Sequence, residues 1–582
     1  MYALEKNQEA VVTKERALIE SLMEFLAGFG APDGDVELLR QTLSDMAAPF
    51  LLVIVGEFNA GKSAFVNALL GDEIAREGSL PTTDQVTILK YSPEPTSTLR
   101  DDGVTELGYP NDLLRAVSVV DTPGTNAVIR EHEEISREFV PRSDMVLFVT
   151  SVERPFSESE REYMRMISDW GKKIVIVVNK KDVLPAPEVD AIQDFVRERV
   201  TELLGLTPPV FMVSAKTARK AKAVAGQDRR DLMEESGFGD LEAYMANLMG
   251  EDDLVNLKLQ SPLGVADQLV GRYLGAAGNR SQLLEEDTRM VENLEGQLGT
   301  YRDETRRDFE VRLGQITLAV SEINERADRF FEEGSGFGGS ILGGLFGRGG
   351  GGNVQERFRE EVVADTGEVI DRRAKELVNW LVYRNLKQWR TVVDYIELHR
   401  KADLTRRLAG ETIADDFNGR REGLLQSIID DSTQAVQGFD YREEAQRLTD
   451  VLQDAVSKTA VREAEATGFG KAAGELAATT TGDITGTTHA VMMVGLEAGK
   501  GRKGRDEFRQ RTRALRERLN EAVQRQLEAE LETSVQQMRE TIVPYVNFVN
   551  SELRRMKTTE SILGKLGVSV RSLEEIVAVT EL

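Results

Sequence analysis

The residues best suited to chemistry form a glycine-rich motif followed by a lysine and a serine. Residues 56–63, GEFNAGKS, match the pattern G-x-x-x-x-G-K-[ST] and lie between a strand-like apolar run and a helical segment. In that context the glycines let backbone N–H groups surround phosphates, the lysine neutralises the β- and γ-phosphates, and the serine hydroxyl binds Mg²⁺. The predicted phosphate-binding residues are Gly56, Glu57, Phe58, Asn59, Ala60, Gly61, Lys62, Ser63 and Ala64.

A second motif, DTPG, begins at Asp121 directly after the apolar run 116–120. An aspartate at a strand end can hold Mg²⁺ through water, and the amide of Gly124 can contact a γ-phosphate. Alone, the motif indicates only a turn. Its position downstream of the glycine-rich motif predicts that Asp121 is a magnesium ligand and that Gly124 contributes to catalysis.

A third motif, NKKD at 179–182, follows the apolar run IVIVV. Its aspartate can accept hydrogen bonds from the N1–H and the exocyclic amine of guanine, which adenine does not offer. By itself NKKD is typical of a solvated charged turn, but in series with the other two motifs it predicts guanine. The segment SAK after the last strand-like run completes the set, with the amide of its alanine near the base. The predicted guanine-binding residues are Asn179, Lys180, Asp182, Ser214, Ala215 and Lys216.

A pair of threonines lies between the first two motifs. A mobile threonine that reaches Mg²⁺ only when the γ-phosphate is present is the expected switch, and we predict Thr83 for this role, with Thr82 as the alternative. A less favoured alternative is that the pair caps the strand-like segment that follows. The complete series predicts a Mg²⁺-dependent GTPase that forms GDP and phosphate by in-line attack of water, assisted by Lys62, without a nucleophilic side chain.

The elements that must position these motifs alternate between strands and helices. Strand-like apolar runs occupy 49–55, 116–120, 145–150, 174–178 and 210–213, and the material between them is long enough for crossover helices. The predicted fold class is therefore an α/β P-loop domain over 48–250, with a mostly parallel sheet covered by helices on both faces. A helical segment, 1–47, precedes it.

The rest of the chain has helical periodicity. Apolar residues recur every three or four positions and proline is nearly absent, which predicts an elongated all-α bundle. Two glycine-rich breaks interrupt it, because glycine at high density disfavours a helix. The predicted segments are helices at 251–333, a loop at 334–353, helices at 354–467, a loop at 468–504 and returning helices at 505–582.

Composition excludes several classes of function. With 582 residues the chain needs several structural units. Its net charge of -26 argues against nucleic acid as the main partner, and the absence of cysteine excludes disulfides, thiolate metal sites and cysteine nucleophiles. The N-terminus lacks the apolar region of a secretory signal and no apolar stretch is long enough to span a bilayer. We expect a cytoplasmic protein that is at most peripherally bound to a membrane.

The motifs and the long helices together resemble the bacterial dynamin-like GTPases, the family that includes mitofusin-like and chloroplast Fzo-like relatives. The resemblance is carried by GEFNAGKS, LPTTD, DTPG, NKKD, the stretch LVNWLVYRNLKQW at 377–389 and DITG at 483–486. It implies a GTPase head, a helical neck that includes residues 1–47, a trunk and a membrane-contacting tip. It also implies nucleotide-dependent pairing of heads, with a copy of itself or with a second dynamin-like chain, and membrane fusion, fission or stabilisation.

Two departures from the family pattern are visible. Eukaryotic dynamins carry a Gln-Ser pair where this chain has Phe58-Asn59, and Asn59 is a candidate for positioning water or a charge-compensating cation. No arginine finger can be assigned, so stimulation by dimerisation is implied by the family alone. The chain also lacks a pleckstrin-like or proline-rich region, so lipid contact has to come from the helical part.

Two stretches are candidates for the membrane tip. The loop 468–504 lies where the family places its paddle and leads into a basic cluster, residues 500–513, with net charge +5. Each such charge favours an anionic surface by about 1 kcal/mol, although a solvated helix face is an equal interpretation. The loop 334–353 carries apolar residues among glycines, typical of a shallow insertion or of a disordered linker. The candidate residues are Lys500, Arg502, Lys503, Arg505, Phe337, Ile341, Leu342, Leu345 and Phe346.

The leading hypothesis is a mechanochemical GTPase that remodels an anionic membrane. The alternative is a soluble regulatory GTPase whose helices bind a protein partner without touching lipid. An RNA or ribosome-assembly GTPase is disfavoured by the acidity of the chain and by the lack of a basic aromatic module.

Overall fold

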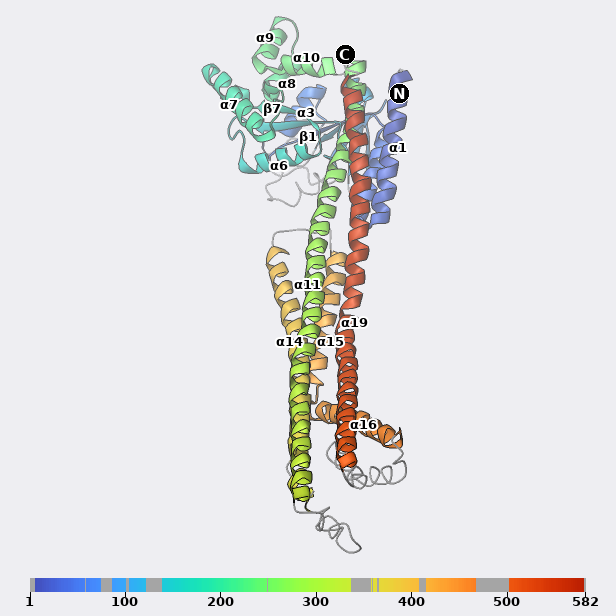
Figure 1. The fold of residues 1–582 in the computed structure, drawn as a ribbon. Helices are drawn as coiled ribbons and strands as arrows, with labels where there is room; N and C mark the ends of the chain where they lie inside the picture. The colour runs from blue at the N-terminus through green and yellow to red at the C-terminus, as the bar shows by residue number, and fades with distance from the viewer. Residues whose placement is uncertain are drawn as a thin grey trace. The chain divides into compact units, whose positions relative to one another are not determined.

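The structure, a computed structural model, contains two compact units (Figure 1). The first comprises residues 1–281 and 555–582, and the second comprises residues 282–554. Two long helices, α11 (Glu251–Gly336) and α19 (Arg502–Val579), contribute residues to both units. The described residues are 6–57, 59–74, 86–100, 104–121, 139–248, 250–336, 357, 359–363, 366–407, 415–466 and 502–579.

The first unit is built on an eight-stranded sheet with the order β3-β4-β2-β5-β1-β6-β7-β8. The strands from β5 to β8 in this order run parallel, whereas β2 is antiparallel to β5 and β3 is antiparallel to β4. The strands are β1 (Phe50–Val55), β2 (Thr87–Tyr91), β3 (Thr96–Leu99), β4 (Thr105–Tyr109), β5 (Val117–Asp121), β6 (Met145–Ser151), β7 (Lys173–Asn179) and β8 (Val210–Met212). The predicted fold class, a mostly parallel α/β sheet with long helices after it, is confirmed.

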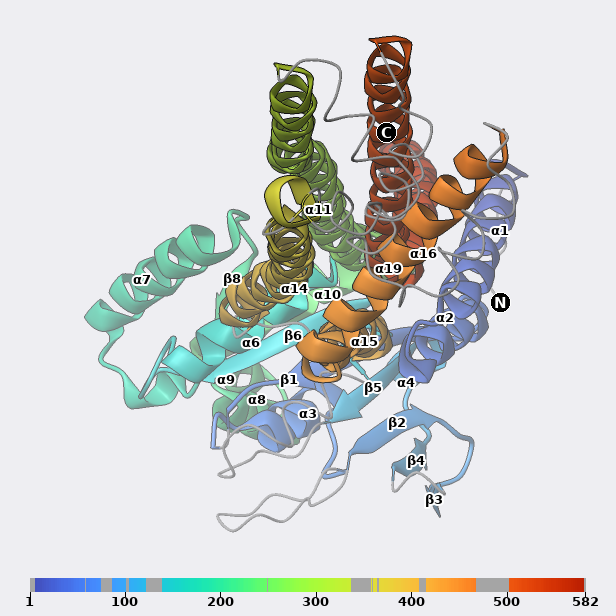
Figure 2. The same cartoon turned by 60° about the horizontal axis from the view of Figure 1, so that its bottom comes forward.

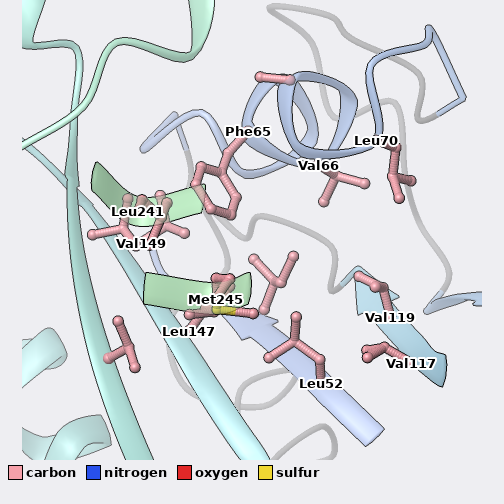
Figure 3. Close-up of a cluster of buried hydrophobic side chains, with 14 of the residues drawn as sticks. Leu52, Phe65, Val66, Leu70, Val117, Val119, Leu147, Val149, Leu241 and Met245 are labelled. Atoms are coloured by element: carbon pink, nitrogen blue, oxygen red, sulfur yellow. The ribbon is translucent and has the colours of Figure 1, made fainter. Parts of the chain in front are cut away.

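Helices cover both faces of this sheet, because its central strands are apolar on both sides. In β1, Leu52 and Ile54 face a cluster formed with α3 (Lys62–Leu70), α8 (Ala215–Ala223) and α10 (Phe238–Leu248). Val53 and Val55 face the opposite cluster, formed with α6 (Glu158–Asp169) and α7 (Ala186–Leu204). Figure 3 shows the first cluster, in which Leu241 of α10 and Phe65 of α3 lie over Val149 of β6.

The sheet also decides where the motifs meet. In the parallel strands β1, β5, β6, β7 and β8 all carboxyl ends lie at one edge of the sheet. Gly56 follows β1, Asp121 ends β5, Asn179 ends β7 and Ser214 follows β8. Residues that are far apart in the sequence are therefore brought together at this edge, which is where ligands bind in open α/β sheets.

The N-terminal helices α1 (Lys6–Phe29) and α2 (Asp33–Asp45) belong to the first unit and pack on its parts of α11 and α19 (Figure 2). The hydroxyl of Tyr273 in α11 donates to Asp35 of α2. From α19, the guanidinium of Arg555 donates to the carbonyl oxygen of Phe29 at 3.2 Å. These contacts tie α2 to α11 and the end of α1 to α19.

The second unit is helical. It contains part of α11, part of α19, and the helices α14 (Thr366–Arg407), α15 (Asp415–Gln437) and α16 (Tyr441–Ala466). A short π-helix, Arg359–Val363, precedes α14. Four of these helices share one apolar cluster, which includes Phe309 of α11, Leu381 of α14, Leu448 of α16 and Leu527 of α19. Among the helices that the structure describes, none has a segment long and apolar enough to cross a membrane.

Candidate nucleotide-binding site

The loop between β1 and α3 has a backbone that only certain residues allow. Gly56 has φ +151° and Gly61 has φ +86°, and a Cβ atom at these positions would collide with the carbonyl oxygen of Val149 and the amide of Asn179, respectively. Asn59 also has a positive φ, +63°. Glycine is therefore required at both ends of the loop. The result is a compact turn that leads into the N-terminus of α3, where free backbone N–H groups favour an anion.

The side chain of Lys62 is folded over this loop. It is 5% exposed, and its Nζ donates to the carbonyl oxygens of Gly56 at 2.8 Å and Glu57 at 3.0 Å. Burial lowers the pKa of Lys62 to about 8, against the opposite effect of Asp121, Glu160 and Glu57. A buried ammonium held mainly by neutral carbonyls would be stabilised by any anion that enters the loop.

Ser63 and Asp121 form a pair suited to a hard cation. Ser63 Oγ donates to Asp121 Oδ2 at 3.2 Å. Asp121 is 3% exposed, and burial raises its pKa to about 6 in spite of Lys62 and Ser63. Its other oxygen, Oδ1, is buried and has no hydrogen-bond partner among the described residues. One hydroxyl and one carboxylate fit Mg²⁺, which is usually bound by one or two carboxylates together with substrate phosphates.

In the described part of the chain, no group of three or more His, Asp or Glu side chains is arranged to hold a metal ion. A site with few protein ligands is what a nucleotide-bound Mg²⁺ needs, because phosphate oxygens and water complete its coordination.

Asn179 links three parts of the site. Its Nδ2 donates to the carbonyl oxygen of Ala60 at 3.0 Å, and its Oδ1 accepts from the backbone amide of Ala215 at 3.0 Å. The side chain is buried. One amide group therefore joins the phosphate loop, the end of β7 and the start of α8.

Asp182 is held in the adjacent position. Ser214 Oγ donates to Asp182 Oδ1 at 2.7 Å, and Lys216 Nζ lies 4.0 Å from Asp182 Oδ2. Ser214 is also the N-cap of α8 and accepts from the amide of Thr217 at 3.1 Å. Lys180 has φ +66° and pairs with Glu153 at 2.6 Å. The structure thus brings the NKKD and SAK segments together.

Some predicted residues lie outside the described ranges. These are Phe58, Thr82, Thr83, Gly124 and, for the membrane tip, Phe337, Ile341, Leu342, Leu345, Phe346 and Lys500. Arg502, Lys503 and Arg505 belong to the first turns of α19, of which the structure describes the backbone but not these side chains.

Sequence reasoning missed a polar group beneath the phosphate loop. The carboxylate of Glu57 accepts hydrogen bonds from Ser157 and Ser159 at the start of α6. Glu160 forms a capping box with Ser157, is 3% exposed, and has its pKa raised to about 7, mainly by burial. The S-x-x-E spacing at 157–160 signals a helix start, but not the fact that this start faces Glu57.

Comparisons with known proteins agree with this geometry. Residues 51–180 match the family model described as "50S ribosome-binding GTPase". Together with the parallel sheet and the motifs at its edge, the match defines residues 51–180 as a P-loop GTPase domain.

More particular similarities extend beyond the domain. The chain is 32% identical over 289 residues to the probable transmembrane GTPase FZO-like, chloroplastic, of Arabidopsis thaliana, which covers 46% of this chain and 32% of that protein. It is 25% identical over 240 residues to the isoniazid-induced protein IniA of Mycobacterium tuberculosis, covering 36% of each chain. The first of these similarities confirms the predicted resemblance to the chloroplast Fzo-like GTPases. The chain spans about a third of the length of these two relatives.

A solved structure described as "An oligomerised bacterial dynamin pair provides a mechanism for the long range sensing and tethering of membranes" is 14% identical. Its TM-score is 0.32, over 98% of this chain and 84% of that chain.

Proposed function

We propose that this chain is a dynamin-like GTPase that binds GTP and GDP together with Mg²⁺ and hydrolyses GTP. The observation that carries the proposal is the path of hydrogen bonds from Ala60 through Asn179 to Ala215. This path supports a single site in which the phosphate loop holds the phosphates and the NKKD and SAK segments read the base, at the carboxyl ends of the parallel strands, where nucleotides bind in this class of fold. We call the NKKD and SAK segments the base-reading segments.

Each part of the site has a role in the proposed reaction. The amides at the start of α3 and the ammonium of Lys62 hold the β- and γ-phosphates and offset the charge that develops during transfer. Asp182, oriented by Ser214, accepts from the N1–H and amine of guanine. Bound Mg²⁺ would neutralise phosphate charge, with Ser63 as a direct ligand and Asp121 acting through water. We assign Thr83 to the metal and the amide of Gly124 to the γ-phosphate. Asn59 would position the attacking water.

The guanine assignment is tested by Asp182→Asn. An amide at this position matches xanthine better than guanine, so the preference for GTP over XTP should fall by at least about 100-fold. Asp190→Asn, at an exposed position of α7, is the matched control and should keep the preference of the wild type. An unchanged ratio of GTP to XTP turnover in Asp182→Asn would show that Asp182 does not read the base.

We further propose that the protein works peripherally at an anionic membrane and pairs through its GTPase heads, with a copy of itself or with a second dynamin-like chain. Three observations support this proposal: the long helices of the second unit, the similarity to a relative whose name includes "transmembrane GTPase", and the basic cluster at 500–513. In this proposal, nucleotide-dependent pairing moves the helices and remodels or stabilises the bilayer, in the cytoplasm.

The membrane proposal is tested by co-sedimentation with phosphatidylserine-containing vesicles, with and without a non-hydrolysable GTP analogue. We expect pelleting with anionic vesicles and its loss when Arg502, Lys503 and Arg505 are changed to Glu. A variant with Lys14, Arg16 and Lys220 changed to Glu controls for the net-charge change, because these residues are exposed and lie far from the cluster in the sequence. No pelleting under any condition would favour the alternative, a regulatory GTPase whose helices bind a protein.

A further inference from the structure

The turn between α9 (Gln227–Ser236) and α10 lies against the base-reading segments, although it carries no nucleotide motif. The backbone amide of Ser214 donates to the carbonyl oxygen of Ser236 at 2.8 Å. Gly237 follows with φ +64°, and a Cβ atom here would collide with the carbonyl oxygen of Met212 and lie 3.3 Å from Lys181 Nζ. The absence of a side chain at Gly237 is therefore what lets the turn approach the end of β8.

The α9–α10 turn is held in place by the packing of α10 against the core. Phe238 is fully buried, and its ring centroid lies 5.5 Å from that of Phe65 in α3. Further along α10, Leu241 and Met245 belong to the same core (Figure 3). Because these side chains are held in the core, the turn cannot withdraw from β8 to make room for an added Cβ.

A second connection secures α10 from the side of α8. Lys222 Nζ donates to the carbonyl oxygen of Ala68, at the end of α3, at 2.6 Å and pairs with Glu242 of α10 at 2.6 Å. Figure 1 shows α8, α9 and α10 close together beside the sheet. Displacement caused by a larger residue at Gly237 would therefore be transmitted to the end of β8.

The segment that would move carries the base-reading groups. Ser214 uses its amide to bind Ser236 and its hydroxyl to orient Asp182, and the next amide, that of Ala215, orients Asn179. We propose that Gly237 is a positioning residue for guanine specificity: by allowing the α9–α10 turn to bind Ser214, it sets the place of Asp182 relative to the base. This inference rests on the proposed function, because it presumes that Asp182 reads guanine.

The test compares Gly237→Ala with Gly205→Ala. Gly205, after α7, has almost the same φ, +65°, but nothing lies within 4 Å of a Cβ atom placed there. Both substitutions introduce the same backbone strain, and only the first introduces a collision. Dissociation constants are measured for GDP and for IDP, which lacks the exocyclic amine, and thermal unfolding checks that each variant is folded.

We expect Gly237→Ala to lower the preference for GDP over IDP by about tenfold or more, the range for loss of a hydrogen bond to a charged group. The affinity for IDP should change much less, because the phosphate loop keeps its contacts. Gly205→Ala should keep the wild-type preference. Equal GDP:IDP ratios in the wild type and in Gly237→Ala would overturn the inference, and so would an equal loss of preference in both variants.

Two further variants keep the test decisive if Gly237→Ala does not fold. Gly237→Asn introduces a Cβ atom in a residue that tolerates a positive φ, and Gly205→Asn is its control. Phe238→Leu keeps the glycine but loosens the packing behind the turn, and we expect a smaller loss of the same preference. An unchanged preference in a folded Gly237→Asn protein would also overturn the inference. Failure of the wild type to bind GDP would instead contradict the proposed function.

Discussion

The nucleotide site of the first unit and the buried ion pair of the second unit both place charged groups away from water, but with opposite consequences. In the nucleotide site burial dominates: the pKa of Lys62 is lowered to about 8 and that of Asp121 is raised to about 6, so each charged form is disfavoured. In the second unit, Asp287 is fully buried and Arg421 is 1% exposed, yet the charges are mutually satisfied.

The difference lies in the number of partners. Burial acts to raise the pKa of Asp287, but hydrogen bonds from Arg421 and His399 outweigh it, and the pKa lies below its usual value. Arg421 Nε donates to Asp287 Oδ2 at 2.6 Å, and His399 Nε2 lies 3.3 Å from Oδ1. By contrast, Asp121 Oδ1 has no partner among the described residues. A buried charge that the protein itself satisfies is structural, whereas the unsatisfied carboxylate of Asp121, which lies beside Ser63 and Lys62 at the end of β5, indicates a site for a ligand.

Breaking the structural pair should produce the largest loss of stability. Arg421→Met leaves Asp287 buried without its main partner, and we expect it to lower the free energy of unfolding of the second unit by about 3–5 kcal/mol. Urea denaturation followed by far-UV circular dichroism measures this, and GTP turnover should remain. The double variant Arg421→Met/Asp287→Leu, which removes both charges, should recover most of the loss. A single variant within about 1 kcal/mol of the wild type would contradict the assignment of a structural pair.

Removing the charge of the nucleotide site should act on activity rather than on folding. Lys62→Met is expected to reduce GTP turnover by about 100- to 1000-fold, the effect of losing one group that stabilises transition-state charge. The stability of the nucleotide-free protein should not fall. Burial lowers the pKa of Lys62 from 10.5 to about 8, so at any pH below 10.5 the charged lysine costs folding free energy, and methionine removes that cost. Lys220→Met, at an exposed position, is the control. Turnover near the wild-type rate would contradict the role of Lys62.

A buried carboxyl in α1 sharpens the comparison. Glu15 is 0% exposed, neither of its carboxylate oxygens has a hydrogen-bond partner among the described residues, and burial raises its pKa to about 9. The pKa of Glu15 in the folded state lies above its unfolded value of 4.5. Its contribution to stability is therefore complete below pH 4.5, and it is lost as the pH rises toward 9, because the unfolded chain gives up the proton more readily than the folded one. By pH 7 the loss amounts to about 3 kcal/mol.

Glu15→Gln should remove this slope, so that thermal unfolding midpoints between pH 5 and 8 fall less steeply than those of the wild type. Glu20→Gln, at an exposed position of the same helix, should retain the wild-type slope. Identical slopes in the wild type and in Glu15→Gln would mean that Glu15 has partners which compensate its burial.

The smallest effect is expected at the edge of the nucleotide site. Ser157→Ala removes both the N-cap of α6 and a hydrogen bond to Glu57, and should lower the stability of the first unit by about 1 kcal/mol. Ser168→Ala, near the end of the same helix, serves as the control for an ordinary serine substitution. A shift in the thermal unfolding midpoint that is equal in both variants would show that the capping box contributes nothing particular.

The sequence was sufficient to predict the central strands of the sheet and the nucleotide-binding motifs. The apolar runs that form β1, β5, β6, β7 and β8 are continuous, because strands buried on both faces need no polar residues. The strands β3 and β4 were not predicted: β3, at one edge of the sheet, is exposed throughout, and its neighbour β4 is half-buried, so neither has a diagnostic pattern. The long stripes of apolar residues likewise indicated α11, α14 and α19, since apolar residues on one face of a helix recur every three or four positions in the sequence.

By itself, the sequence determined which groups could bind a guanine nucleotide and Mg²⁺, because that chemistry depends on residue types at short, fixed spacings. Only the tertiary structure decided which distant groups support them. Glu160 beneath the phosphate loop, Gly237 behind Ser214 and Arg421 opposite Asp287 are brought to their partners by the packing of whole helices. No local pattern encodes such a contact, since it depends on how buried faces of separate elements fit together.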